Sequence, residues 1–227
     1  MNFSLNLKTL PIQDLPDLPL DLEPKVHPSV LSKIKRFIDI VGALVGLAIT
    51  SAIALPIALA MQLDDPGSVF YSQIRCGVNG KPFRIWKFRS MIIDADRQKH
   101  LVQNQAQGHI FKNENDPRIT RVGRFLRRTS LDEFPQFWNV LKGEMSLVGT
   151  RPPTVEEVAK YDKHHLQRLL VKPGITGEWQ VKGRSNVTDF EQIVQMDLDY
   201  QQKWSSLYDI SLIIRTIIVV LNRKGAC

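Results

Sequence analysis

The chain of 227 residues has room for one catalytic domain and a membrane element, which excludes two sizeable independent domains. Lysines and arginines number 30 against 23 aspartates and glutamates, and the formal net charge of +7 favours partners that carry phosphate, anionic lipid or nucleic acid. The two cysteines, Cys76 and Cys227, have neither the spacing of a metal site nor that of a disulfide framework, which indicates a reducing compartment.

Residues 1–32 are rich in leucine, proline and aspartate. Because the prolines exclude a long helix, we predict a flexible N-terminal arm over these residues. The segment has neither the charged start nor the small-residue cleavage site of a signal peptide, so nothing in it indicates removal or secretion.

Residues 40–61 form an apolar stretch without a single charge. A helix of about 22 residues rises about 33 Å, which is enough to cross a hydrocarbon core of about 30 Å. A buried core helix is the alternative, but a chain this short has little protein with which to surround such an apolar cylinder. We therefore expect a membrane helix over residues 33–63.

Basic residues flank this apolar stretch on both sides, at positions 33–36 and again around positions 118–128. Such residues favour the cytoplasmic side of a membrane, and the later apolar run at 210–221 is too short to cross back. Pro56 cannot donate a hydrogen bond to the carbonyl of Ala52, so a kink is expected there. A re-entrant helix that enters and leaves by one leaflet is therefore favoured over a straight span.

The rest of the chain, residues 64–227, is predicted to form a cytosolic domain of short elements. Residues 69–75 and 83–88 are rich in β-branched and aromatic side chains around a turn, which predicts a hairpin. The run at 210–221 is apolar on most faces, and it fits either the bilayer interface or packing over the bent helix. The expected fold is α+β and mostly helical, with a re-entrant membrane helix and interfacial amphipathic helices. Two helix starts are predicted by capping-box spacing, at Thr154 with Glu157 and at Thr188 with Glu191.

Arginines are concentrated just before the middle of this domain. Arg121, Arg124 and Arg128 are spaced by three and four residues, so on a helix they share one face, with Arg127 on an adjacent face. Such a face attracts phosphate groups. The alternative is a solvated basic face near anionic headgroups.

An acidic pair, Asp132 and Glu133, follows directly. Ser130 and Glu133 have capping-box spacing and Pro135 suits a first turn, so the pair is predicted to open a helix. Acidic residues in a first turn are favoured by the helix dipole in any protein. The functional interpretation is that one carboxylate attacks a phosphorus atom while its neighbour holds Mg²⁺ on a diphosphate. The spacing alone allows both interpretations.

Several motifs in order make the sequence recognisable from about residue 33 to the C-terminus. The chain resembles the monotopic phosphoglycosyl transferases among the bacterial sugar transferases, and the resemblance is carried by residues 87–91, 116–123, 127–133, 139–152 and 172–177. It implies a re-entrant membrane helix and a two-step reaction through a phosphosugar held on the enzyme. By resemblance, Asp132 is the nucleophile, Glu133 the Mg²⁺ ligand, Arg127 and Arg151 phosphate-binding residues, and Lys87 and Arg89 neighbours of the same phosphate site.

One departure concerns the end of the chain, where the commoner Asn-Gly-Arg motif is replaced by Lys182-Gly183-Arg184. Arg184 is therefore kept as a candidate nucleotide contact, without an assigned role.

The resemblance also implies the substrates and the location. The expected donor is a nucleotide sugar, with UDP as the nucleotide, and the acceptor is undecaprenyl phosphate at the bacterial inner membrane, with the catalytic domain on the cytoplasmic face. The product would start exopolysaccharide, capsule or O-antigen synthesis. A non-catalytic membrane scaffold for polysaccharide assembly is the alternative, and it would not need the Asp132–Glu133 pair. A homo-oligomer is left open, and nucleic acid is not expected because the long apolar stretch does not fit such a protein.

Overall fold

A computed structural model describes residues 26–111, 113–182 and 187–222 of the chain. Arg184 and most of the predicted arm lie outside the described residues. The arm was expected to extend to residue 32, but its last part already belongs to the fold, because Pro28–Leu31 form the short helix α1. His27 caps this helix and also contacts the carbonyl of Gln201 through Nε2 at 3.1 Å.

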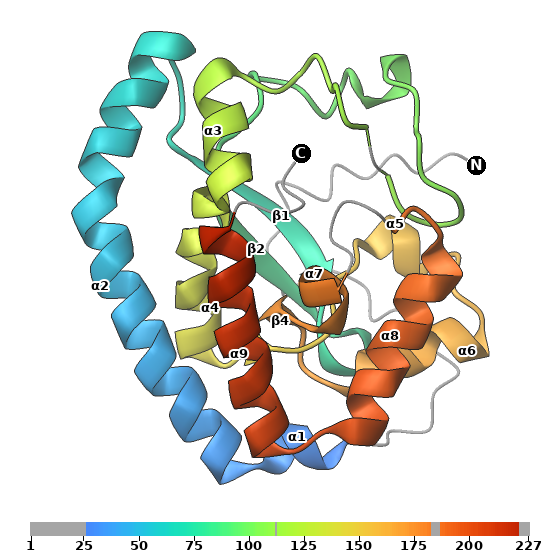
Figure 1. The fold of residues 1–227 in the computed structure, drawn as a ribbon. Helices are drawn as coiled ribbons and strands as arrows, with labels where there is room; N and C mark the ends of the chain where they lie inside the picture. Colours follow the sequence, from blue (N-terminus) through green and yellow to red (C-terminus); the bar gives the residue numbers. More distant parts are fainter. Residues whose placement is uncertain (1–25, 112, 183–186, 223–227) are drawn as a thin grey trace.

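The longest element is α2, a helix of 32 residues that spans Lys33–Asp64. By length and composition it can cross a membrane, and it is the one such helix in the described parts of the chain. Only 22% of its most apolar 18-residue window is buried, so it is not the core helix of the alternative interpretation. Figure 1 shows α2 lying along one side of the other elements.

Pro56 does not interrupt α2, which continues without a break to Asp64. Figure 1 shows that α2 bends along its length, and the predicted kink at Pro56 stays a prediction. The helix packs on the same domain on both sides of the proline, at Gly46 against Phe137 and at Met61 in a cluster with Phe88. Since both halves are fixed to one surface, the freed carbonyl produces curvature and no separate second helix. The re-entrant path stays a prediction.

Charged side chains attach the first turns of α2 to the domain. Lys35 donates to the Asp209 carboxylate at 2.7 Å and to the Val148 carbonyl at 2.8 Å, and both charged groups are buried. One turn later, the Asp39 carboxylate accepts hydrogen bonds from the hydroxyl of Ser146 and the N–H of Leu147, each at 2.8 Å. These contacts satisfy charges that would be costly inside hydrocarbon.

Two small sheets form the middle of the domain. Strands β1 (Phe70–Cys76) and β2 (Pro82–Phe88) pair antiparallel, which confirms the predicted hairpin. The turn between them places Asn79 in the left-handed region at φ 51°, a conformation that asparagine tolerates. Strands β3 (Ser146–Val148) and β4 (Gly174–Thr176) pair in parallel.

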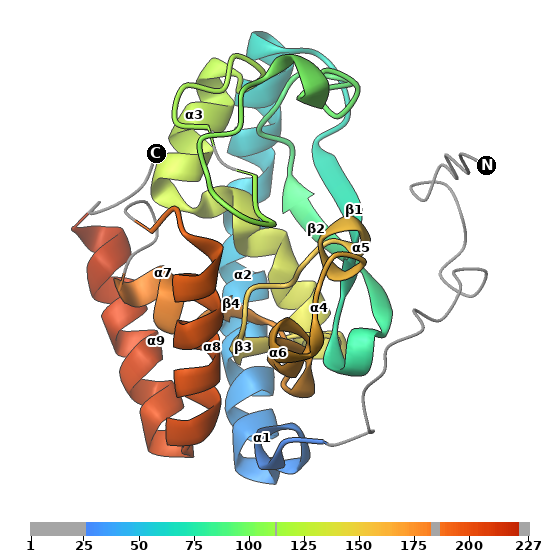
Figure 2. The same ribbon diagram turned by 90° about the vertical axis from the view of Figure 1, so that its right-hand side faces the viewer.

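The remaining described elements are helical, which confirms a mostly helical α+β fold. Figure 1 shows α7 between α8 and α9, and α7 packs against both helices. Figure 2 shows α8 and α9 on one side of the domain and the β1–β2 hairpin on the other. The α-helices are α3 (Arg121–Thr129), α4 (Phe137–Lys142), α5 (Val155–Val158), α6 (Lys163–Leu166), α7 (Glu178–Lys182), α8 (Phe190–Lys203) and α9 (Ser206–Leu221). The short 3₁₀ helices are η2 (Val78–Gly80), η3 (Lys99–Leu101), η4 (Leu131–Gln136) and η5 (Gln167–Leu170).

Helix α9 packs on the domain along one side, whereas its place at the bilayer interface stays a prediction. It packs on α7, α2, β3 and β4 around the fully buried Leu212. Its other side leaves large apolar side chains exposed, among them Leu207, Ile214 and Ile217.

The two predicted capping boxes had different outcomes. Thr154 and Glu157 form a reciprocal capping box at the start of α5, as expected. The one predicted at Thr188 is wrong, because Asp189 caps α8 by accepting from the N–H of Glu191. Aspartate is a stronger N-cap residue than threonine, so Asp189 takes the free N–H groups one residue later.

The ion pair between α2 and α9 gives the first testable prediction. Lys35→Met removes the ammonium and leaves the Asp209 carboxylate buried, so the free energy of unfolding should fall by about 3–5 kcal/mol. Lys33→Met is the matched control, because Lys33 is exposed on the same turn and should cost no more than about 0.5 kcal/mol. Urea unfolding in detergent micelles, followed by tryptophan fluorescence, measures both. Equal losses would show that this buried pair does not attach α2 to the domain.

Candidate functional site

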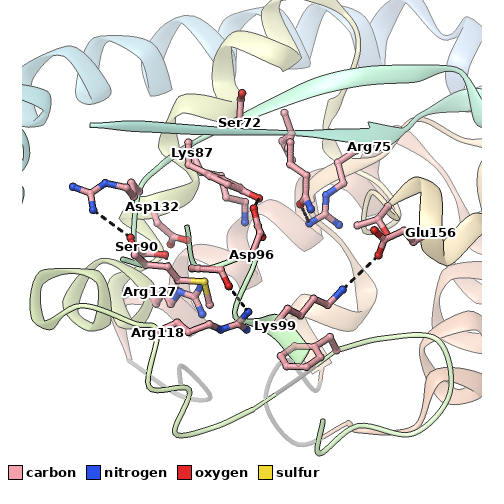
Figure 3. Close-up of a pocket in the computed structure, with 18 of the residues that line it drawn as sticks. Ser72, Arg75, Lys87, Ser90, Asp96, Lys99, Arg118, Arg127, Asp132 and Glu156 are labelled. Carbon is pink, nitrogen blue, oxygen red and sulfur yellow. Dashed lines mark hydrogen bonds and ion pairs between the residues drawn. The ribbon is translucent and has the colours of Figure 1, made fainter. Parts of the chain in front are cut away.

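A pocket of about 680 Å³ opens beside the β1–β2 hairpin. Figure 3 shows Asp132, Ser90 and Arg127 at one end and Arg75 at the other, near Glu156. The lining combines the two strands, the segment that follows β2, the end of α3, η4 and α5. Positive and negative side chains face one cavity, which suits a ligand with several phosphate groups and a metal ion or polar sugar.

The acidic pair lies in the tight turn between α3 and α4. Ser130 ends α3 in the left-handed conformation at φ 60°, and residues 131–136 then form η4. The predicted capping box is wrong, because the Ser130 side chain makes no capping hydrogen bond. The acidic pair does open a helix, since Asp132 and Glu133 lie in the first turn of η4, which is a 3₁₀ helix. Asp132 lines the pocket and is only 6% exposed. The local geometry thus holds one carboxylate of the pair within the cavity.

Glu133 is held by the neighbouring strand. Its Oε1 accepts from the ammonium of Lys87 at 2.8 Å, and both side chains are about one-quarter exposed. Lys87 comes from β2, which packs against η4, and it lines the pocket. The structure therefore brings together Lys87, Asp132 and Glu133, which the sequence had grouped by resemblance.

Arg127 connects α3 to the same end of the pocket. Its Nε donates to the Ser90 hydroxyl at 2.9 Å, and its guanidinium lines the cavity. Burial lowers the pKa of Arg127, whereas the negative charges of Asp132 and Asp116 act to raise it. Gly123 makes this approach feasible, since a Cβ at that position would lie 2.0 Å from the carbonyl oxygen of Ser90.

Arg89 lines the pocket but is committed to the protein. Its guanidinium pairs with the Asp65 carboxylate just after α2, and Nε donates to the Ser68 carbonyl at 2.7 Å. A further bond at 3.3 Å reaches the Met91 carbonyl. This arrangement favours a positioning role, in which Arg89 connects the end of α2 to the segment after β2, over the phosphate binding expected by resemblance.

Arg151 lies at the other end of the pocket, with a second arginine beside it. Its Nη1 lies 3.2 Å and 3.3 Å from the two carboxylate oxygens of Glu157. Arg75 from β1 donates to the Pro152 carbonyl at 2.9 Å and to the Gln73 side chain at 2.7 Å. Burial and the nearby charge of Arg151 lower the pKa of Arg75 to about 10. Two guanidiniums share one carboxylate, so this end carries a net positive charge that favours an anion.

The residue-level prediction missed Arg75. The signal was present, because a strand places residues two apart on one face, and Gln73 with Arg75 fits that alternation. No sequence rule showed that β1 would bring this face next to Arg151, since the β1–α5 contact is long-range.

The two carboxylates of the acidic pair are the candidate ligands for Mg²⁺ at this pocket. The described residues contain no group of three or more His, Cys, Asp or Glu side chains that could hold a metal. Mg²⁺ usually needs only one or two protein carboxylates when substrate phosphates supply other ligands. Asp132 and Glu133 meet that requirement. The ammonium group of Lys87 pairs with the Glu133 carboxylate and supplies its positive counter-charge.

The chain is similar to a known protein family and to several known proteins. The family described as "Bacterial sugar transferase" matches residues 30–223. The chain is 53% identical over 194 residues to the galactosyl transferase CpsE of Streptococcus agalactiae, covering 85% of this chain and 43% of CpsE. It is 41% identical over 225 residues to the UDP-glucose:undecaprenyl-phosphate glucose-1-phosphate transferase of Escherichia coli K12, covering 96% and 45%.

A shorter relative matches over most of its own length. The exopolysaccharide production protein ExoY of Rhizobium meliloti is 38% identical over 198 residues, which cover 85% of this chain and 87% of ExoY. The chain thus spans less than half of CpsE and of the Escherichia coli transferase, but most of ExoY.

The cluster around Glu157 gives a prediction about pH. Burial acts to raise the pKa of Glu157, but the charges of Arg151 and Arg75 outweigh it and the pKa is lowered from 4.5. A carboxyl group with a depressed pKa stabilises the fold above its ordinary pKa, and this stabilisation is lost as the pH falls through the folded-state value. Glu157→Gln should therefore be less stable by roughly 2 kcal/mol at pH 7, and the difference should narrow as the pH falls below 4.5 and through the lowered folded-state pKa.

Urea unfolding of both proteins between pH 7 and pH 3.5 measures this difference. Glu156→Gln is the matched control, because the Glu156 side chain is 75% exposed and its substitution should change little at any pH. A gap between wild type and Glu157→Gln that stays constant with pH would contradict the electrostatic role.

Proposed function

Because the chain belongs to the bacterial sugar transferase family, we propose that it transfers a sugar 1-phosphate from a UDP-sugar to undecaprenyl phosphate. The relatives named for such a reaction act on UDP-glucose or on galactose, and the ExoY proteins are named for exopolysaccharide production. The proposed reaction therefore starts the assembly of an exopolysaccharide or capsule. The observation that carries the proposal is the buried Asp132 carboxylate beside Arg127 in a cavity lined with cationic side chains.

The first proposed step is an attack by Asp132 on the phosphorus atom attached to the sugar. A carboxylate oxygen forms a bond to phosphorus, the bridging P–O bond of the diphosphate breaks, and the bond's electron pair leaves with uridine monophosphate. Arg127 lies near Asp132 and contributes positive charge where the phosphoryl oxygens would lie. The product of this step is an aspartyl phosphosugar.

In the second proposed step, a phosphate oxygen of undecaprenyl phosphate attacks the same phosphorus atom. The bond to Asp132 breaks, the carboxylate is restored and a lipid diphosphosugar is formed. Splitting the transfer in this way means that two highly charged substrates need not occupy the pocket together. The cavity that Asp132 lines, with cationic side chains around it, supports this order.

The other charged residues have proposed roles that follow from their positions. Arg151, with Arg75 beside it, would bind the phosphate of the departing nucleotide, since a planar guanidinium makes two parallel hydrogen bonds to phosphate. Lys87 would leave Glu133 for a phosphate oxygen, which frees the carboxylate as a metal ligand. Mg²⁺, when bound, would offset the charge of the diphosphate oxygens.

The lipid substrate and the apolar α2 both support association with a membrane. We propose that α2 holds the domain on the cytoplasmic face of the inner membrane, with both ends of the helix on that side. The basic residues on both flanks of α2 favour this topology.

The covalent step gives a direct test of the function. Purified protein should release uridine monophosphate from a panel of UDP-sugars only for the true donor, and in the absence of lipid it should release about one per active site. Labelled sugar should remain on the peptide that contains Asp132. Asp132→Asn should abolish both the burst and the label, because an amide is not a competent nucleophile.

Two controls make this test decisive. Hydroxylamine should remove the label from an acyl phosphate but not from a phosphoester on Ser130 or Thr129. Asp199→Asn is the matched variant, since Asp199 lies on α8 outside the pocket and should retain the burst. Label on Asp132→Asn would refute the nucleophile assignment, and the absence of any turnover in wild type would favour the non-catalytic scaffold.

The topology has a test of its own. Single cysteines introduced as Ser4→Cys or Lys142→Cys, in a Cys227→Ser background, should both be protected from an impermeant maleimide in intact spheroplasts. Cys76 does not interfere, because it is buried and burial raises the pKa of its thiol to about 12. Lysed spheroplasts supply the positive control, in which both positions should react. Labelling of position 142 alone in intact spheroplasts would establish a straight span.

A further inference from the structure

Helix α3 divides its side chains among three surroundings. At about 100° per residue, Val122 and Leu126 share one side of the helix, and they pack in the cluster that contains Ile57 and Met61 of α2. Arg127 points into the pocket. The remaining side carries Arg121, Arg124 and Arg128, and all three are exposed. We call these three residues the α3 arginine face.

The α3 arginine face does not belong to the catalytic pocket. Its three residues are absent from the pocket lining, which takes Arg127 from the adjacent side of the same helix. None of the three makes an ion pair or a side-chain hydrogen bond to any residue that the structure describes. Three positive charges on about two helical turns are therefore left without a counter-charge from the described chain.

An apolar side chain separates this face from α2. Phe125 is 55% exposed and lies, on the helical circumference, between the side that packs on α2 and the arginines. In water, an exposed phenylalanine beside three arginines contributes no stabilising contact. At a membrane interface the same arrangement is stabilising, because the ring enters the apolar region while the guanidiniums remain at headgroup level.

Helix α2 continues the apolar surface. Its outer side exposes Leu55, Leu59 and Leu63, the last of them by 89%. The start of α3 is fixed to the end of α2, because the N–H of Val122 donates to the Asp64 carboxylate at 2.8 Å. Figures 1 and 2 both show α3 beside this end of α2. The order across the surface is apolar helix, phenylalanine, then arginines.

We propose that the α3 arginine face binds the anionic headgroups of the membrane surface beside the inserted face of α2. The proposed partner is the bilayer itself, because the three arginines adjoin an apolar surface. A free phosphate would make no apolar contact with Phe125. The contact fixes the angle at which the domain and α2 together meet the bilayer, and through Arg127 on the same helix it sets the pocket against the headgroup layer. The proposal depends on membrane association and not on the proposed chemistry.

Vesicle flotation of the full-length protein tests the proposal without any substrate. Vesicles of phosphatidylcholine alone are compared with vesicles that contain 30% phosphatidylglycerol, in low and high salt. Binding through α2 is common to both vesicle compositions. The partition coefficient for vesicles with phosphatidylglycerol, divided by that for phosphatidylcholine alone, therefore measures the contribution of the charged contact. Each Arg→Gln change at 121, 124 or 128 should lower this ratio about 5-fold, and the triple variant on the order of 100-fold.

The matched control removes the same charge from other elements. Lys81, Arg97 and Lys203 are exposed on the hairpin turn, on the segment after β2 and on α8, and their triple Gln variant should keep the ratio. Far-ultraviolet circular dichroism confirms that both triple variants are folded, and the three single variants measure the effect if the triple variant is not. High salt should reduce the wild-type ratio toward that of the Arg121, Arg124 and Arg128 triple variant.

Three outcomes would overturn the proposal. One is an unchanged ratio in the Arg121, Arg124 and Arg128 variant, and another is an equal loss in the control. The third is displacement of wild type from phosphatidylglycerol vesicles by inorganic phosphate at constant ionic strength, which would assign the face to a free phosphate group. If the protein releases no uridine monophosphate but the ratio behaves as expected, the proposed function is contradicted and the membrane contact of the α3 arginine face is not.

Discussion

The attachment of α2 to the domain is the constraint on which the rest of the structure depends. An apolar helix that exposes most of one side can rotate about its own axis unless specific contacts fix its orientation on the domain. Lys35 and Asp39 make that connection by burial beside Asp209 and Ser146. Because both side chains are satisfied only in this arrangement, the helix cannot rotate without leaving a buried charge unpaired. The direction of the exposed apolar side of α2 and the position of the pocket are thereby set together.

The pocket uses arginine in two different ways. Arg89 and Arg118 donate to carboxylates and carbonyls from several segments, and they hold together the segments that form the walls. Arg127 and Arg151 each face the cavity and donate to one side chain among the residues that the structure describes, Ser90 and Glu157 respectively. The guanidiniums with more N–H groups left over are better placed to bind a phosphate. Residue type alone does not make this distinction, because it depends on which carbonyls lie within reach.

Helix α3 shows how one short element connects three functions. Its apolar side packs on α2, Arg127 reaches the pocket and the α3 arginine face points outward. The close approach at Gly123 to the backbone of Ser90 keeps the helix from sliding along the pocket wall. A displacement of α3 at the membrane would therefore be transmitted to the site with little loss, since packed interiors deform only slightly.

Local patterns in the sequence predicted the helices and strands named below, and the resemblance to a family pointed to the acidic pair as the candidate catalytic residues. The hairpin, the apolar helix and the capping box at Thr154 follow from residue alternation, apolar length and side-chain spacing, which act over a few residues. The tertiary structure decided what depends on distant partners. Arg89 pairs with Asp65, and Arg75 lies beside Arg151. Both arrangements depend on contacts between residues far apart in the chain, so no rule that acts over a few residues predicts them.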